Sequence, residues 1–252
     1  MESPQAPVSD DPSAWMDSTR LLDLHDPKVR LKAQSLTHLH RTDREKALAI
    51  YGAVKRITFA KPVKFRLRTA HEVLRIKRAD AEDKATLFVA MLRAVQIPAR
   101  LSYLELHGDI LRGLTNAIAS AGRPAVQAWI DGRWRTTDTY IFDAHYLAAA
   151  RARLRAQQWD WGYGVHRRGD SLWDGIGDAY LTGNEQMSAA ISIGHLGTFH
   201  DPYDFQLSQA YRDRYPHVTR TMRWNVLSPG MNRAVWHLRD SQPGRLGSLG
   251  SL

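Results

Sequence analysis

The sequence predicts an α+β fold in which one buried helix packs on an antiparallel sheet, and three features of the 252-residue chain indicate it. Between residues 81 and 95, apolar side chains cover most of a helical circumference, which is typical of a helix surrounded by protein. Residues 99–106 alternate as a strand does, directly after this helix. Asp131 and Gly132 then separate two strand-like arms, a pattern typical of a type I′ hairpin.

Before the buried helix, the sequence predicts two longer helices and one short turn of helix. Asp26 followed by Pro27 marks the first start, because aspartate caps helix N-termini and proline suits the first helical position. Thr42 and Glu45 have the spacing of a capping box at the second start. The short turn is expected at 70–76.

The buried helix itself is expected to begin near Ala81. Asp80 is a good N-cap, and Asp83 stands where it completes a carboxylate version of the capping box. Glu82 and Asp83 also lie where the helix dipole favours negative charge. Pro98 ends the helix, because proline disfavours helical backbone at the residue before it.

The second half of the chain has weaker periodicity. A glycine-containing rim loop is expected at 107–123, and a helix at 142–157. Residues 158–216 are rich in aromatic residues, glycine and histidine, and are interpreted as loops and short helices that cover a cleft. A last helical segment is expected over 215–239, interrupted at Ser228 by Ser-Pro-Gly.

The two ends of the chain are expected to be flexible. Proline, serine and aspartate dominate residues 1–17, and a glycine- and serine-rich tail follows at 241–252. One domain is therefore expected over 18–240. No apolar run approaches the roughly 20 residues that span a bilayer and no secretory signal is visible, so a cytoplasmic protein with no membrane contact is expected.

Composition narrows the chemistry. The chain has no cysteine, which excludes disulfides, thiolate nucleophiles and cysteine-ligated metals. It also lacks a phosphate loop, a dinucleotide fingerprint and a histidine spacing for zinc, so no metal or other cofactor is expected. The net charge is +9, and the basic residues crowded before the buried helix, among them Lys61, Lys64 and Arg68, are interpreted as a solvated surface. No nucleic-acid-binding motif accompanies these residues, so nucleic acid is not expected as a partner. An anionic small-molecule or carrier-borne substrate fits the charge equally well, and a protein partner stays an alternative.

Two parts of the sequence carry a family resemblance. The first starts at Ala81 as Ala-Glu-Asp-Lys-Ala-Thr-Leu and continues at Met91 as Met-Leu-Arg-Ala-Val-Gln-Ile-Pro-Ala-Arg. The second is the pattern Gly-Arg-Trp-x-x-x-Asp that ends at Asp138. Together they resemble the transglutaminase-like, papain-type superfamily, and within it a bacterial group. The resemblance implies a transglutaminase-like core with an elaborated C-terminal half.

The resemblance also implies where a Cys-His-Asp triad would lie. Ala81 stands at the position of the nucleophilic cysteine, and the family histidine falls at Arg123, or at Gln127 in an alternative placement. Asp138 matches the acidic member. Alanine offers no nucleophile and arginine does not deprotonate, so the triad is degenerate and thiol chemistry is excluded. Because both the cysteine and the histidine of the triad are missing, natural loss of the triad is favoured over a single engineered Cys-to-Ala change.

The residues that remain suggest other chemistry. If Arg123 lies beside Asp138, the pair becomes a fixed ion pair that lowers the pKa of Asp138. Alternatively Arg123 points into the cleft and binds a substrate carboxylate, aided by the helix N-terminus at Ala81. Glu82 or Asp83, shielded from water, could donate a proton. The plainer interpretations are a strand end for Asp138, a solvated loop residue for Arg123 and a helix cap for Asp83.

Histidine and tryptophan supply the other candidates. His166, His195 and His200 lie in glycine-rich, loop-like sequence, where a replacement acid or base could stand. Trp173 is expected in the core or in an apolar cleft wall. The candidate catalytic residues are thus Asp138, Glu82, Asp83, His166 and His195, and the candidate substrate-binding residues are Ala81, Arg123, Trp129, Trp173 and His200.

Two functional hypotheses follow, from different classes. The first is an enzyme that has exchanged cysteine chemistry for acid/base or electrostatic catalysis, such as cyclisation, isomerisation or hydrolysis of a metabolite in a bacterial biosynthetic pathway. The second is a catalytically inactive relative that binds a peptide, carrier or partner protein through the old substrate groove. The histidine- and tryptophan-rich region favours the enzyme, whereas a filled space between Ala81, Arg123 and Asp138 would favour the binding protein.

Overall fold

A four-stranded antiparallel sheet forms the centre of the computed structural model, which describes residues 9–215 and 225–240. The strand order is β5-β4-β3-β8. The strands are β3 (Ala99–His107), β4 (Ser120–Ile130), β5 (Arg133–Thr137) and β8 (Ser192–Phe199). Asp131 and Gly132 join β4 to β5 with φ values of 51° and 75°, as a type I′ turn requires. The predicted α+β fold and its hairpin are confirmed.

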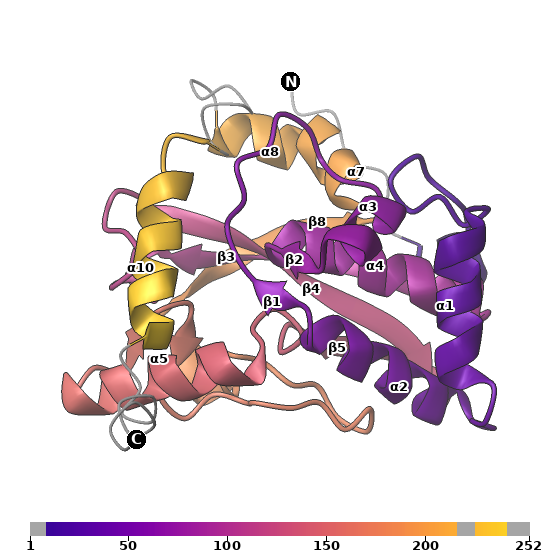
Figure 1. The fold of residues 1–252 in the computed structure, drawn as a ribbon, viewed down its shortest axis with the longest axis horizontal. Coiled ribbons are helices and arrows are strands. Elements are labelled where there is room, and N and C mark those ends of the chain that lie inside the picture. The colour runs from indigo at the N-terminus through magenta and orange to yellow at the C-terminus, as the bar shows by residue number, and fades with distance from the viewer. Residues whose placement is uncertain (1–8, 216–224, 241–252) are drawn as a thin grey trace, which may run out of the picture.

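Helix α4 (Ala81–Ala94) lies across one face of this sheet and contacts β3 and β4 (Figure 1). Its burial from Glu82 to Arg93 confirms the predicted helix surrounded by protein. The Asp80 side chain caps it by accepting a hydrogen bond from the N–H of Asp83 at 3.1 Å. The predicted capping box is not formed, because the Asp83 carboxylate is bonded instead to two cations that come from elsewhere in the chain.

Three helices from the first third of the chain pack on α4. They are α1 (Pro27–Thr37), α2 (Asp43–Lys55) and α3 (Ala70–Ile76). The predicted caps are confirmed: the Asp26 carboxylate accepts hydrogen bonds from the first free N–H groups of α1, and Thr42 and Glu45 form the capping box of α2.

Residues 9–17 are the described part of the N-terminal segment that was expected to be flexible, and they differ from that expectation. Trp15, in a 3₁₀ helix (Pro12–Trp15), is buried because its ring stacks beside His200 and Arg100.

Two short parallel strands, β1 (Thr58–Phe59) and β2 (Arg78–Ala79), flank α3 in the sequence. The segment between β1 and α3, residues 60–69, arches past the N-terminal end of α4 (Figure 1) and is called the 60–69 strap below. Two asparagines from the last part of the chain hold it. The Oδ1 of Asn225 accepts the N–H of Lys64 at 2.9 Å, and the Oδ1 of Asn232 accepts the N–H of Lys61 at 2.8 Å. Each side-chain amide also donates to the carbonyl of the same lysine.

The second half of the chain surrounds the remaining edges of the sheet. Helix α10 lies beside α5 (Figure 1), and α7 and α8 contact β8. These elements are a 3₁₀ helix (Gly108–Leu111), α5 (Ala144–Ala156), β6 (Trp161–Gly162), β7 (Val165–His166), α6 (Glu185–Ser188), α7 (Pro202–Leu207), α8 (Gln209–Arg214) and α10 (Ser228–Asp240). The predicted helix at 142–157 is confirmed as α5, and Ser228 marks a helix start.

Two predictions about irregular segments are wrong in part. Residues 192–199, expected among loops, form the edge strand β8, whose pairing with β3 shifts register twice. Gly194 and Gly197, the latter with a φ of 121°, interrupt the alternation that reveals most strands. Residues 120–123, expected in the rim loop, belong to β4, so Arg123 is a buried strand residue and not a solvated one.

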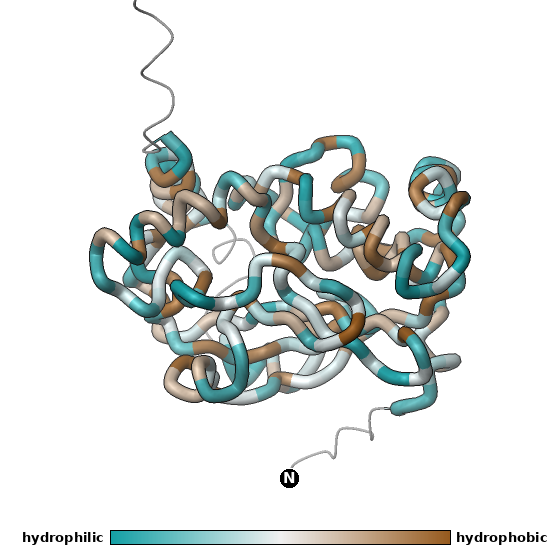
Figure 2. Tube along the Cα trace, turned by 90° about the horizontal axis from the view of Figure 1, so that it is seen from below, coloured by the Kyte–Doolittle hydropathy of each residue, from teal (hydrophilic) through white to brown (hydrophobic). Residues whose placement is uncertain are grey.

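Hydrophobic segments are short and alternate with hydrophilic ones along the chain (Figure 2). Within residues 9–215 and 225–240, no helix is long and apolar enough to cross a membrane. The flexible tail predicted at 241–252 and the first residues of the segment predicted at 1–17 lie outside the described residues. The boundaries 18–240 of a single domain stay a prediction.

Candidate functional site

The first turn of α4 is the place where the resemblance sets a catalytic nucleophile. Ala81 is its first residue and carries only a methyl group, while Asp80, Glu82 and Asp83 surround it with three carboxylates. All three acidic side chains are buried, with 1%, 7% and 1% of their surface exposed. Buried carboxylates must be paired to be tolerated, so their partners decide what this site can do.

Lys64 of the 60–69 strap is the central partner. Its Nζ lies 2.9 Å from Oδ2 of Asp80, 3.0 Å from Oδ1 of Asp83 and 3.8 Å from Oε2 of Glu82. The lysine itself is 4% exposed. A single ammonium therefore bridges the three carboxylates of the helix start and closes them off from solvent.

Two further cations complete this cluster. Lys61 Nζ lies 3.0 Å from Oδ2 of Asp80, and Arg68 Nη1 lies 3.3 Å from Oδ2 of Asp83. All three cations belong to the 60–69 strap, so the cluster (Lys61, Lys64, Arg68, Asp80, Glu82 and Asp83, called the strap cluster below) joins the strap to α4. The prediction that these basic residues form a solvated surface is wrong for Lys64, whose charge is neutralised inside the protein.

Burial and charge act in opposite directions on the pKa values of the strap cluster. Burial opposes ionisation of Asp80, but Lys61 and Lys64 outweigh it and lower the pKa of Asp80. For Asp83, burial and the neighbouring Asp80 charge outweigh Lys64 and raise its pKa to about 6. Burial alone would lower the pKa of Lys64, yet the charges of Asp80 and Asp83 raise it. Lys64 is therefore a permanent cation at neutral pH, and Asp83 is the member whose charge changes most easily.

Arg123 and Asp138 form a second buried pair, as one of the two sequence-based alternatives expected. Arg123 Nη1 donates to Oδ2 of Asp138 at 3.0 Å, and its Nη2 donates to the carbonyl of Gly164 at 2.6 Å. The N–H of Leu181 donates to the other oxygen, Oδ1, at 2.7 Å. With both terminal nitrogens bonded and 7% of its surface exposed, Arg123 does not point into an open cleft.

The expected lowering of the Asp138 pKa is wrong in direction. Asp138 has no exposed surface, and burial raises its pKa above the ordinary value, although Arg123 and the Leu181 amide oppose the change. The sequence indicates the charged partner but not the complete removal of water, which is the larger effect here.

The three candidate histidines lie in separate surroundings. The His166 ring packs on Trp161 in the β6–β7 hairpin, with ring centroids 4.4 Å apart. His195 Nε2 lies 2.8 Å from Oγ of Ser102 across the β3–β8 pair. His200 stacks beside Trp15. Burial lowers the pKa of each of the three rings.

No histidine among the described residues has a hydrogen bond or an ion pair with Asp138, Glu82 or Asp83, so the structure does not assemble a replacement triad from them. The candidate tryptophans are also apart from the helix start. Trp173 is 4% exposed and packs against Tyr51 and Phe88 in the core. Trp129 packs edge-on against Trp134 on the β4–β5 hairpin.

Sequence reasoning missed the 60–69 strap as part of the site. Its lysines were visible as part of a basic stretch, but their partners lie 16 to 19 residues away in the next helix. The signal that could have identified them is the row of acidic residues at Asp80, Glu82 and Asp83 on a helix that is otherwise apolar, because such a row needs cations nearby. In the described part of the chain, no group of three or more acidic or histidine side chains is arranged to hold a metal ion.

Part of this chain is similar to two solved structures, namely a candidate cysteine protease from Cytophaga hutchinsonii and a candidate protease from Parabacteroides distasonis. The first is 20% identical with a TM-score of 0.43, over 56% of this chain and 44% of that one. The second is 19% identical with a TM-score of 0.35, over 50% of this chain and 24% of that one. The chain thus spans less than half the length of either, and no curated protein matches it.

A family model matches part of the chain. The model described as transglutaminase-like superfamily matches residues 31–139, a range that begins in α1, contains α4, β3 and β4, and ends just after Asp138. The helix that starts at Ala81 and the hairpin that carries Arg123 and leads to Asp138 therefore lie within the match. Residues 31–139, less than half of the chain, thus match the transglutaminase-like superfamily, in a chain that contains no cysteine.

Proposed function

We propose that this chain is a catalytically inactive member of the transglutaminase-like superfamily that works by binding an acidic peptide segment of a partner protein. The observation that carries the first half of this proposal is the position of Lys64, which lies over the first turn of α4 and bonds to Asp80 and Asp83. Lys64 holds the carboxylates on both sides of Ala81 in buried ion pairs, and it cannot leave without exposing those charges.

Acid/base catalysis at the same place is disfavoured for a related reason. A general acid must reach a substrate proton through at most one water molecule. Asp138 is fully buried and accepts bonds from Arg123 and Leu181, and Asp83 is bonded to Lys64 and Arg68. These carboxylates are well placed to stabilise the fold, and a substrate has no path to them.

The binding half of the proposal is based on a groove on the outer side of the 60–69 strap. Its volume is about 560 Å³, within the range of ligand sites. Strap residues form one wall and helix α10 forms the other. The lining, called the α10 groove below, comprises Thr58, Phe59, Ala60, Pro62, Arg68, Ile76, Arg78, Asn232, Arg233, Val235, Trp236 and Arg239.

The chemistry of the α10 groove suits an acidic peptide with apolar side chains. Arg78 and Arg233 are exposed, and neither has an ion pair among residues 9–215 and 225–240. Trp236 and Ile76 offer apolar surface beside them, with 61% and 40% of their surface exposed. Exposed tryptophan and arginine are the residue types that dominate binding energy in protein interfaces. Carboxylates of a partner would meet the arginines, and its apolar side chains would cover Trp236.

Calorimetric titration of the full chain tests this function. The probe is an eight-residue peptide of alternating glutamate and leucine, and the control is the same peptide with glutamine in place of glutamate. We expect saturable binding of the acidic peptide and at least about tenfold weaker binding of the neutral one, a difference that corresponds to about 1.4 kcal/mol. Arg78→Gln and Arg233→Gln should each weaken binding, whereas Arg30→Gln, an exposed residue of α1, should not.

Two results would overturn the proposal. Equal affinity for the acidic and neutral peptides would remove the charge argument for the α10 groove. Mass spectrometry of the same mixtures provides the second check, because a peptide that is cleaved or modified by the wild-type chain, and not by Asp138→Asn, would identify an enzyme.

A further inference from the structure

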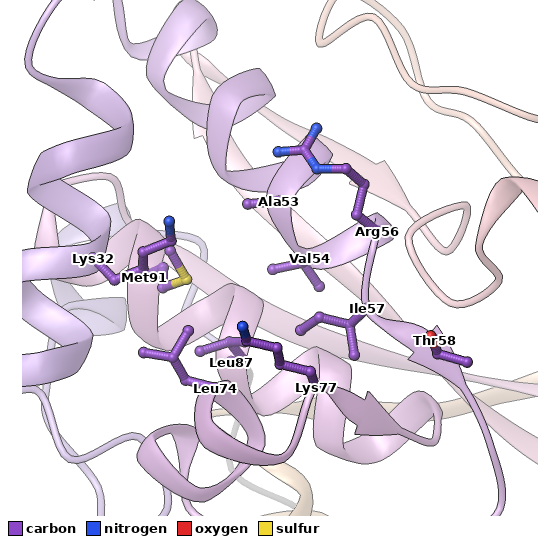
Figure 3. Close-up of a pocket in the computed structure, with 10 residues that line it drawn as sticks. All are labelled: Lys32, Ala53, Val54, Arg56, Ile57, Thr58, Leu74, Lys77, Leu87 and Met91. Atoms are coloured by element: carbon purple, nitrogen blue, oxygen red, sulfur yellow. The ribbon is translucent and has the colours of Figure 1, made fainter.

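A second pocket adjoins the α10 groove, with which it shares Thr58, and lies between helices α1, α2, α3 and α4. Its volume is about 360 Å³, at the small end of the range for ligand sites. Figure 3 shows the side chains that line it. They are Lys32, Ala53, Val54, Arg56, Ile57, Thr58, Leu74, Lys77, Leu87 and Met91, and this set is called the α1–α3 pocket below.

The floor of the α1–α3 pocket is apolar. Leu87 and Met91 come from α4 and Val54 from α2, and at most 1% of each is exposed. Leu74 of α3 and Ile57 are half-buried beside them. Such a floor takes up an apolar body of a few carbon atoms, because each buried methylene group contributes about 0.8 kcal/mol.

The rim carries three cations and no acidic residue. Lys32 projects from α1, Arg56 follows α2 and Lys77 follows α3, so three separate elements place cationic side chains around the pocket (Figure 3). All three are exposed, and none of them has an ion pair within the described ranges.

Helix geometry explains only part of this arrangement. Cations at helix C-termini are stabilised by the helix dipole, which accounts for Arg56 and Lys77. Lys32 lies in the middle of α1, so the dipole of that helix does not account for its place. Lys77 also has left-handed backbone, with a φ of 56°, at a position where glycine is usual. A lysine is kept there at a conformational cost, and its side chain lines the pocket.

We infer that the α1–α3 pocket binds a small amphiphilic anion, namely a molecule with one carboxylate or phosphate head and a short apolar body. The head meets Lys32, Arg56 and Lys77, and the body covers Leu87 and Met91. Of the residues that line this site, Thr58 also lines the α10 groove, but its three cations do not, and the inference does not depend on the function proposed above.

Calorimetric titration of the full chain with octanoate tests the inference, with 1-octanol as the neutral control of equal length. We expect octanoate to bind with 1:1 stoichiometry and 1-octanol to bind at least about tenfold more weakly. Octyl phosphate should displace octanoate, and the ratio of the two affinities shows which head the site prefers. Raising the salt concentration should weaken the binding of both anions, because salt screens the exposed cations.

Variants connect the binding to this pocket. Lys32→Gln and Lys77→Gln should each weaken octanoate binding by about threefold to tenfold. Ala53→Leu, which adds volume to the lining without changing charge, should weaken it as well. Lys28→Gln is the matched control, because Lys28 is exposed on α1 one turn before Lys32 and does not line the pocket. Thermal unfolding of each variant verifies that it is folded.

The inference is overturned if 1-octanol binds as tightly as octanoate, if octanoate shows no saturable binding, or if folded Lys32→Gln and Lys77→Gln variants bind octanoate like the wild type. Arg233→Gln should leave octanoate binding unchanged, since Arg233 lines the α10 groove only.

Discussion

Lys64 lies with its Nζ 3.0 Å from Oδ1 of Asp83, so a residue of the 60–69 strap pairs with a carboxylate of the helix at whose start the sequence resemblance places a nucleophile. Both side chains are buried, and a second aspartate, Asp80, shares the same ammonium. The region that the resemblance marks as an active site is thereby a closed electrostatic contact, and this contact leads to the first two predictions.

Replacing Lys64 with methionine should destabilise the fold strongly. The change keeps the length of the side chain but leaves Asp80 and Asp83 buried with less positive charge, and breaking a buried pair costs about 3–5 kcal/mol of unfolding free energy. Urea denaturation measures the loss. Lys46→Met is the control, because Lys46 pairs with Asp43 at the surface and its loss should have little effect. A loss as small as that of the control would show that the strap cluster contributes little to stability.

The stability of the protein should fall as pH rises from about 4 to 6, through the titration of Asp83. Its pKa of about 6 in the folded state exceeds the value of about 3.9 in an unfolded chain, so the folded state binds the proton more tightly in this window. Protonated Asp83 therefore stabilises the fold below the unfolded pKa, and the gain is lost as pH rises through the folded pKa. Asp80 acts in the opposite sense and at lower pH, because its pKa is lowered.

Urea denaturation of the wild type and of Asp83→Asn across pH 4–7 isolates this contribution. The difference between the two free energies of unfolding should change by about 2–3 kcal/mol across the window. A difference that stays constant with pH would show that Asp83 titrates in the folded state as it does in the unfolded chain.

Arg123→Met should destabilise the protein by about 3–5 kcal/mol at neutral pH, because it leaves the fully buried Asp138 carboxylate without its cation. The loss should shrink at acidic pH, where Asp138 can bind a proton. The double variant Arg123→Met with Asp138→Asn should recover part of the loss, since the remaining partner is neutral. If the double variant is as unstable as the sum of the two single ones, the two residues do not act as a pair.

Removing the contacts of Asn225 and Asn232 should make the 60–69 strap more mobile. Asn225→Ala together with Asn232→Ala removes hydrogen bonds to the main chain of Lys64 and Lys61. Hydrogen exchange at these two amides should become faster, and binding of the acidic peptide to the α10 groove should weaken because the strap forms one wall of it. Asn184→Ala, which changes only the cap of α6, is the control. Unchanged exchange at Lys61 and Lys64 would assign the ordering of the strap to the strap cluster alone.

Local signals account for the parts of the fold that could be predicted. Asp26, Thr42 and Asp80 cap helices by bonds to backbone groups two or three residues away, and Asp131 with Gly132 sets the hairpin through its own backbone angles. Strand β8 could not be predicted, because glycine interrupts its alternation and its partner β3 lies about 90 residues earlier.

In the candidate site, too, local contacts could be predicted and contacts between distant segments could not. The pairing of Arg123 with Asp138 follows from adjacent strands of one hairpin, so the resemblance sufficed to anticipate it. The contact between Lys64 and the start of α4 depends on the path of an irregular segment, which no periodicity encodes. The degree of burial of these side chains could not be predicted from the sequence. For Asp138, burial reversed the expected direction of the pKa shift.

The two asparagine contacts also set an order of assembly. They join Lys64 to a residue 161 positions later and Lys61 to one 171 positions later. Contacts this distant in sequence form late, since the intervening chain must already be compact. During synthesis these two contacts therefore cannot form until Asn225 and Asn232 have been added, and until then only the strap cluster holds the strap to the start of α4.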